Sequence, residues 1–156
     1  MNTYDPQKAA RVWQRVQNQA KAEERELSNP EGSIRGLIME ERISAAIYLQ
    51  LSRQVPSREA SVLQRLFREK QTHGACLRGI YTLITGEKPE VKLPAVASEK
   101  TDLMLRRCYA REMRMLKEYE ARSSDPEYGP IFTRLAEQER EHCRAVLEVI
   151  GGLQKK

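Results

Sequence analysis

The sequence predicts an all-α protein, a four-helix bundle with one long crossover connection and an extra helix at its N-terminus. Three observations support this fold class. Apolar residues recur at helical spacing along almost the whole chain. Two helical hairpins of similar sequence follow one another. The 14-residue link between them, residues 87–100, contains two prolines and is too long for a tight turn, so it suits a crossover.

Length and composition indicate a single domain, because 156 residues are enough to bury a core. The three cysteines, Cys76, Cys108 and Cys143, lie inside expected helices and form no Cys-x-x-Cys pair. This pattern predicts a reducing compartment and neither a disulfide nor a rubredoxin module. The sequence shows no signal peptide and no apolar run of membrane-spanning length. We therefore expect a cytoplasmic protein with no membrane partner.

The net charge of +5 comes largely from arginines, including four on one expected helix, Arg106, Arg107, Arg111 and Arg114. A basic surface of this kind can bind nucleic acid or another polyanion. Charges of both signs are interspersed along the chain, however, and no nucleic-acid-binding motif is present. We therefore expect solvated helix faces and no nucleic-acid partner.

The first expected helix spans about residues 7–27, within an N-terminal segment, 1–28, that precedes the bundle. Its apolar residues recur at helical spacing, at Ala9, Val12, Trp13 and Val16. This pattern predicts an amphipathic helix packed on the outside of the bundle. Asn29-Pro30 should end it.

Four longer helices form the bundle, residues 33–150. The first two span about residues 33–54 and 58–85, and Gly86 is the residue type of a left-handed C-cap. The last two span about residues 101–122 and 130–150. Pro130 fits the first turn of the final helix, and Gly151-Gly152 should end that helix.

The two hairpins repeat a pair of residues in their first helices. Glu41 precedes Tyr48 by seven residues, and Glu112 precedes Tyr119 by the same spacing. A duplicated helical hairpin explains this self-similarity.

The second helix of each hairpin carries one of the two histidines of the chain. His142 follows Glu139 by three residues, a spacing that places a carboxylate and an imidazole side by side on one helix face. His73 follows Lys70 by the same spacing. The repeat is therefore complete in the second hairpin and altered in the first.

Six ionisable residues of the repeat fall in the apolar stripes of their helices. Burying unpaired ions costs several kcal/mol of solvation, and a bound metal removes that cost. Carboxylate and imidazole ligands suit iron, manganese or zinc, and a bundle with two such Glu and two Glu-x-x-His pairs holds two metals. The sequence supplies five of the six expected ligands. The six residues are Glu41, Lys70, His73, Glu112, Glu139 and His142.

These residues and the run LAEQEREH, from Leu135 to His142, resemble the ferritin-like superfamily and within it the rubrerythrin group, over about residues 33–150. The resemblance implies a ferritin-like bundle that binds iron and forms a homodimer. It also implies an oxidoreductase, of peroxidase or ferroxidase type, acting on peroxide or oxygen. By this resemblance Glu41 and Glu112 are terminal carboxylates, Glu139 is a bridging carboxylate, and His73 and His142 are the imidazole ligands.

The chain departs from the group in two respects. It lacks a rubredoxin-like cysteine module, and Lys70 occupies the position of the second bridging carboxylate. An ammonium in place of a carboxylate changes the local charge by two units and repels a second divalent cation, so we expect one bound ion instead of two. The ammonium should lie within hydrogen-bonding distance of at least one of Glu41 and Glu139, in place of the metal on the Glu41 side. The remaining ion would be held by Glu112, Glu139 and His142.

Simpler roles for the same side chains stay open. His73 and His142 can be core histidines that hydrogen-bond a carboxylate. Tyr48 and Tyr119 are expected to fill the seam and hydrogen-bond a carboxylate, with no redox role. Glu69 points about a hundred degrees away from Lys70 around the helix, so we do not expect it to act as a substitute ligand.

Two classes of function follow. The first is a ferritin-like metal-binding protein, an iron-dependent oxidoreductase with a degenerate metal site. The second is a non-catalytic helical scaffold or interaction module in which Lys70 replaces a metal by ion pairs. Metal content distinguishes the two.

Overall fold

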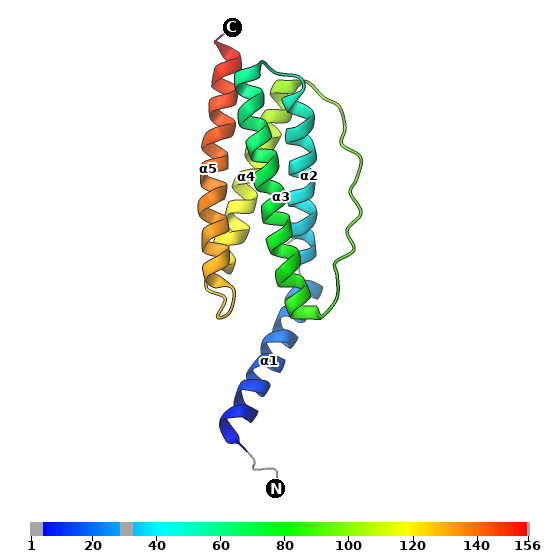
Figure 1. The fold of residues 1–156 in the computed structure, drawn as a ribbon, viewed down its shortest axis with the longest axis vertical. Coiled ribbons are helices and arrows are strands. Elements are labelled where there is room, and N and C mark those ends of the chain that lie inside the picture. The colour runs from blue at the N-terminus through cyan, green and yellow to red at the C-terminus, as the bar shows by residue number, and fades with distance from the viewer. Residues whose placement is uncertain (1–4, 29–32, 156) are drawn as a thin grey trace.

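The computed structural model describes residues 5–28 and 33–155. This part of the chain is all-helical, as the sequence predicts (Figure 1). Asn29-Pro30, the expected end of the first helix, lies outside the described residues. The helices are α1, Pro6–Ser28; α2, Ile34–Ser52; α3, Ser57–Thr85; α4, Thr101–Arg122; and α5, Gly129–Gln154.

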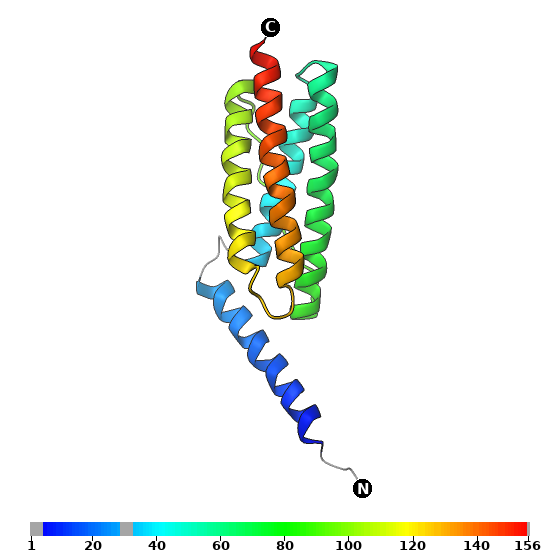
Figure 2. The same cartoon turned by 90° about the vertical axis from the view of Figure 1, so that its left-hand side faces the viewer.

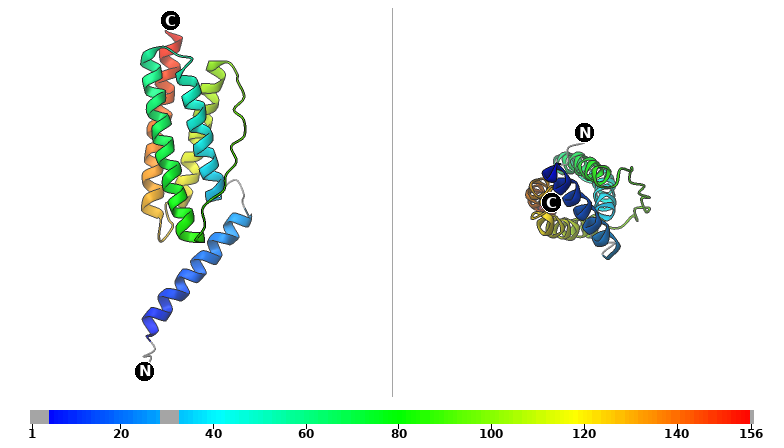
Figure 3. Two further views of the ribbon diagram at one scale, coloured as in Figure 1. Left: turned by 45° about the vertical axis from the view of Figure 1, so that its right-hand side comes forward. Right: turned by 90° about the horizontal axis from the view of Figure 1, so that it is seen from below.

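Helices α2 to α5 form a bundle of two antiparallel hairpins. Helix α2 packs against α3 and α4, and α5 packs against α4 and α3. The crossover after α3 runs along the outside of the bundle next to α2, from one end to the other (Figures 1 and 3). Arg42 on α2 donates a hydrogen bond of 3.2 Å to the carbonyl oxygen of Val91 in this segment. Because the crossover returns to the end where α3 begins, α4 runs in the same direction as α3.

The helix ends follow local chemistry with one exception. The Ser33 hydroxyl accepts a hydrogen bond from the Gly36 amide at the start of α2. Gly86 ends α3 at φ 74°, a left-handed conformation that glycine adopts without strain. Pro130 lies in the first turn of α5. The expectations for Gly86 and Pro130 are confirmed.

The predicted end of the last helix at Gly151-Gly152 is wrong, because α5 continues to Gln154. Its final turns pack against the start of α3. A Cβ atom on Gly152 would come within 2.6 Å of Glu59 Oε1, so the missing side chain permits this close approach. Tertiary packing therefore outweighs the weak helix propensity of two glycines.

The interior of the bundle has three layers along its axis. One apolar cluster lies at the end of the bundle nearest α1, and its members include Leu37, Leu77 and Leu135. A second lies at the far end, and its members include Leu66 and Val146. The six ionisable residues of the repeat lie between the two clusters. The structure thus places a polar layer in the middle of an apolar core.

Helix α1 does not pack on the outside of the bundle, which corrects the sequence prediction. It extends away from the end of the bundle where α2 begins (Figure 2). Val12, Trp13 and Val16 keep 50–64% of their surface exposed. The bundle helices bury their apolar seams against one another, and α1 turns polar residues toward the cavity at this end of the bundle. As far as the structure describes the chain, none of its helices is both long and apolar enough to cross a membrane.

Candidate functional site

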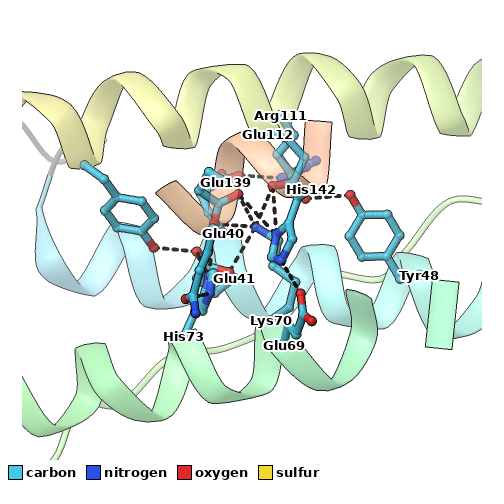
Figure 4. Close-up of polar contacts among 12 residues, drawn as sticks. Glu40, Glu41, Tyr48, Glu69, Lys70, His73, Arg111, Glu112, Glu139 and His142 are labelled. Atoms are coloured by element: carbon cyan, nitrogen blue, oxygen red, sulfur yellow. Dashed lines mark hydrogen bonds and ion pairs between the residues drawn. The ribbon is translucent and has the colours of Figure 1, made fainter. Parts of the chain in front are cut away.

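The candidate site is the polar layer, and all four bundle helices contribute to it (Figure 4). Each of its side chains points inward because it falls on the apolar stripe of its own helix. Every member is at most 2% exposed. We call the set the carboxylate cage: Glu41 from α2, Lys70 and His73 from α3, Glu112 from α4, and Glu139 and His142 from α5.

The Lys70 ammonium lies among all three carboxylates of the cage. Its Nζ donates hydrogen bonds of 2.8 Å to both oxygens of Glu139. It also lies 2.7 Å from Glu112 Oε2 and 3.2 Å from Glu41 Oε2. The predicted contact with at least one of Glu41 and Glu139 is confirmed. The ammonium is not confined to the Glu41 side, because Glu112 supplies the nearest oxygen.

The two tyrosines hold the remaining carboxylate oxygens in place across the hairpins. Tyr48 donates a hydrogen bond of 2.5 Å to Glu112 Oε1. Tyr119 donates a short hydrogen bond to Glu41 Oε1. Burial and the adjacent carboxylates raise the pKa of both tyrosines well above the ordinary value, so both stay neutral donors. The prediction that they hydrogen-bond carboxylates is confirmed.

The two imidazoles face the cage with Nδ1 and point Nε2 outward. His73 Nδ1 lies 3.0 Å from Glu139 Oε1, and His142 Nδ1 lies 3.5 Å from Glu139 Oε2. The ring centroids are 5.2 Å apart and nearly parallel. On the outer side, His73 Nε2 contacts Gln138 Oε1 and His142 Nε2 contacts Glu69 Oε2, each at 2.7 Å.

Gln138 is a site residue that the sequence analysis missed, and Glu69 is one that it weighed only as a metal ligand. Each oxygen accepts the Nε2 proton of a histidine on the other hairpin, and the second proton of the charged ring, on Nδ1, faces the carboxylates. Each residue also stands immediately before the Lys70 or Glu139 position. That shared register in the repeat is the signal that could have identified them.

The three carboxylates of the cage differ in pKa. Burial raises the pKa of Glu41, but the Lys70 ammonium and His73 outweigh burial and lower it to about 2. The pKa of Glu112 is held well below its usual range, since Lys70 again outweighs burial. The pKa of Glu139 rises to about 7, because burial and the charges of Glu41 and Glu112 outweigh Lys70. Glu139 is therefore the carboxylate that takes up a proton first.

The histidines supply the other positive charges. Burial lowers the pKa of both rings, but the carboxylates that they face outweigh it and raise the pKa of His73 and His142 to about 9. With Glu139 ionised, three carboxylates face three cations, namely Lys70 and the two imidazolium rings. The charges of the cage cancel among its own side chains.

A single metal ion has a possible ligand set in the cage. His73, Glu139 and His142 each offer a ligand atom, and the three atoms lie within 4.8 Å of one another. His142 Nδ1 is buried and has no hydrogen-bond partner among the described residues. An ion here would compete with Lys70 for Glu139, because the ammonium bonds both of its oxygens.

The arginines expected to be solvated are partly paired. On α4, Arg111 and Arg114 both bond Glu40 Oε2, at 2.5 Å and 3.1 Å, and Arg107 bonds Glu99 at 2.7 Å. Acidic neighbours therefore compensate much of the charge that suggested a polyanion-binding surface.

Comparison with protein-family models, curated proteins and solved structures found no match. The resemblance to the ferritin-like superfamily thus depends on the residues of the repeat alone and stays a prediction. The iron, the oxidoreductase activity and the homodimer that this likeness implies stay predictions.

Proposed function

We propose that the chain is a ferritin-like bundle in which the Lys70 ammonium replaces a dinuclear metal centre, and that it acts as a metal-independent helical binding module. The observation that carries the proposal is the position of Lys70 Nζ, 2.7–3.2 Å from oxygens of all three cage carboxylates. An ammonium at these distances makes charge-assisted hydrogen bonds, which are the strong ones.

A dinuclear metal centre does not fit these residues. Such a centre needs bridging carboxylates with free oxygens, and both oxygens of Glu139 are bonded to Lys70. At the second bridging position the chain has a cation where a ligand is required. A cation at this distance also repels each added divalent ion by several kcal/mol, even at an effective dielectric constant of about 20. These residues therefore do not support a reaction at a pair of metals.

The packing of the bundle supports a metal-independent fold. Two apolar clusters enclose the cage. Burial of this kind stabilises by about 25 cal/mol per Å², so the helices do not depend on a metal as those of a zinc finger do. We expect circular dichroism of the protein treated with a chelator to retain the helical signal of the untreated protein. Loss of most of that signal would contradict a metal-independent module.

The direct test compares the metal content of the wild type with that of Lys70→Glu and Lys70→Gln after reconstitution with ferrous iron and removal of free ions. The wild type should retain no stoichiometric metal. Lys70→Glu restores the second Glu-x-x-His, so bound iron should rise toward two ions per chain. Lys70→Gln is the matched control, because it removes the ammonium without adding a carboxylate. Two ions in the wild type would overturn the proposal.

A second candidate, a protein that binds one metal ion, is favoured by the ligand set of His73, Glu139 and His142. It requires Lys70 to move or to lose its proton. In that case the wild type should retain one ion per chain. His142→Ala should then lower metal content more than His73→Ala, since His142 Nδ1 has no hydrogen-bond partner among the described residues. Equal losses would contradict this asymmetry.

A further inference from the structure

Helix α1 carries an apolar stripe that nothing in the described structure covers. The stripe consists of Ala9, Val12, Trp13 and Val16, which recur at helical spacing. Trp13 keeps 64% of its surface exposed, Val12 55% and Val16 50%. The exposed large apolar residues of the bundle, Leu83, Leu103, Ile131 and Leu147, are by contrast spread over three helices. An exposed amphipathic face on one helix is a mark of an interaction surface.

The orientation of α1 excludes the chain's own bundle as the cover. A cavity of about 450 Å³ lies between α1, the end of α3 at Leu83 and Ile84, and the loop before α5, and α1 contributes only polar residues to it, among them Asn18 and Lys21. Asn18 is the one half-buried residue among residues 5–21. At 100° per residue, Asn18 lies about 140° around the helix from Trp13. The polar side of α1 thus faces the bundle, and the apolar stripe faces away from it.

The charge on this part of α1 is strongly positive. Residues 5–21 contain Lys8, Arg11, Arg15 and Lys21 against a single acidic residue, Asp5. All five are exposed. Lys8 stands four residues before Val12, so it lies beside the apolar stripe. A partner that covers the stripe therefore meets a positive border.

We infer that α1 docks on the surface of an anionic phospholipid bilayer, with its axis in the plane of the membrane and the apolar stripe buried at the headgroup boundary. Basic amphipathic helices with a tryptophan on the apolar face and low mean hydropathy bind membranes in this way. Each basic residue near an anionic surface strengthens the attraction. The expectation of no membrane partner came from the lack of a spanning segment, and a helix that lies on the surface needs none.

A second copy of the chain fits the stripe less well. Side-by-side contact of two α1 helices over residues 5–21 would bring like charges together, whereas anionic lipid offers the opposite charge. The acidic residues of α1 follow residue 22 in the sequence. An antiparallel pair of α1 helices is therefore the competing outcome that an experiment must separate. The inference goes beyond the proposed function and is independent of the state of the cage.

Trp13 is the only tryptophan of the chain, so its fluorescence reports on the stripe directly. The full-length protein is mixed with vesicles of phosphatidylglycerol and phosphatidylcholine, and separately with vesicles of phosphatidylcholine alone. We expect a blue shift of the emission and co-flotation of the protein only with the anionic vesicles. Added salt should weaken the binding, because it screens the basic residues. Lys8→Glu should weaken it about tenfold.

The Val12→Asp/Val16→Asp variant should lose both the shift and the flotation. The matched control is Leu147→Asp on α5, since Leu147 is as exposed as Val16, at 50%, and lies on the bundle. This control should bind as the wild type does. Equal binding to both kinds of vesicle, or an unchanged Trp13 emission, would overturn the inference. A blue shift without vesicles, together with a dimer in solution that Val12→Asp/Val16→Asp abolishes, would show that a second copy covers the stripe.

Discussion

The two hairpins of the bundle place matching residues in matching positions but differ in charge. In α2 and α3 the series is Glu41, Tyr48, Glu69, Lys70, His73, and in α4 and α5 it is Glu112, Tyr119, Gln138, Glu139, His142. Each tyrosine bonds the glutamate of the other hairpin, and each histidine bonds residue 69 or 138 across the interface. The two hairpins are therefore related by an approximate twofold symmetry of contacts.

The symmetry fails at two adjacent positions. Lys70 of the first hairpin corresponds to Glu139 of the second, and Glu69 corresponds to Gln138. The first hairpin thus has a cation inside the cage and a carboxylate at its border, while the second has a carboxylate inside and a neutral amide at its border. The comparison shows that an ammonium contributed by one hairpin balances carboxylates contributed by both. Four predictions test this, from the largest expected effect to the smallest.

Exchanging Lys70 and Glu139 with each other should leave most of the free energy of unfolding intact, although each single substitution should not. Lys70→Glu alone leaves four buried carboxylates, and Glu139→Lys alone leaves two buried ammonium groups. Each should cost about 3–5 kcal/mol of unfolding free energy, since an unpaired ion stays buried. The double variant with both changes keeps the ion pair and should recover most of this loss. Urea denaturation in the presence of a chelator gives the coupling free energy of the pair. A double variant as unstable as the sum of the single variants would show that the approximate symmetry has no energetic meaning.

Stability should fall on both sides of about pH 5. The pKa values of His73 and His142 rise from 6.5 to about 9, so their contribution is complete below about pH 6.5 and is lost as the pH rises toward 9. The raised pKa of Glu139, about 7, acts in the same direction. The pKa of Glu41, lowered to about 2, gives stability that is lost below about pH 4.5. The loss toward pH 9 should be on the order of a few kcal/mol.

Denaturation at several pH values measures this profile. The His73→Gln/His142→Gln variant is the control, because it removes both titrating rings and should flatten the alkaline side. An alkaline side as steep as that of the wild type would show that the histidines do not carry the charge balance.

The hydrogen bonds of Tyr48 and Tyr119 should contribute equally to the free energy of unfolding. Tyr48→Phe and Tyr119→Phe each leave one carboxylate oxygen buried without its donor, which costs about 1–3 kcal/mol. Thermal unfolding of the two variants should give losses of similar size. A loss confined to one of them would show that the cage is organised around one hairpin only.

Substitutions at Glu69 and Gln138, the residues at the border of the cage, should change the free energy of unfolding least. Glu69 is 39% exposed at its side chain, so Glu69→Gln should change the free energy of unfolding by about 1 kcal/mol or less. It should nevertheless lower the pKa of His142, because it removes a carboxylate that bonds Nε2. Gln138→Glu should raise the pKa of His73 for the converse reason. NMR titration of the two imidazoles measures both shifts, and unchanged values would rule out the role assigned to this border.

The sequence by itself determines the helices and the composition of the cage. Apolar spacing of 3–4 residues sets which face of each helix turns inward, and that spacing carries Glu41, Lys70, His73, Glu112 and the pair Glu139 and His142 into the same layer. Local chemistry also fixes the left-handed cap at Gly86 and the start of α5 at Pro130. These features depend on residues that are near one another in the chain, so a single sequence is enough to predict them.

Only the tertiary structure decided the contacts within the cage. Lys70 and Glu139 are 69 residues apart, and the rotation and axial offset of the helices settle which oxygens the ammonium reaches. The same holds for the partners of Glu69 and Gln138, and for α5 beyond Gly151, where packing against Glu59 extends the helix. The direction of α1, which points away from the bundle, is likewise a tertiary feature that its apolar spacing did not predict. Contacts between distant segments depend on how the helices pack against one another, and the spacing of residues within one helix does not predict that packing.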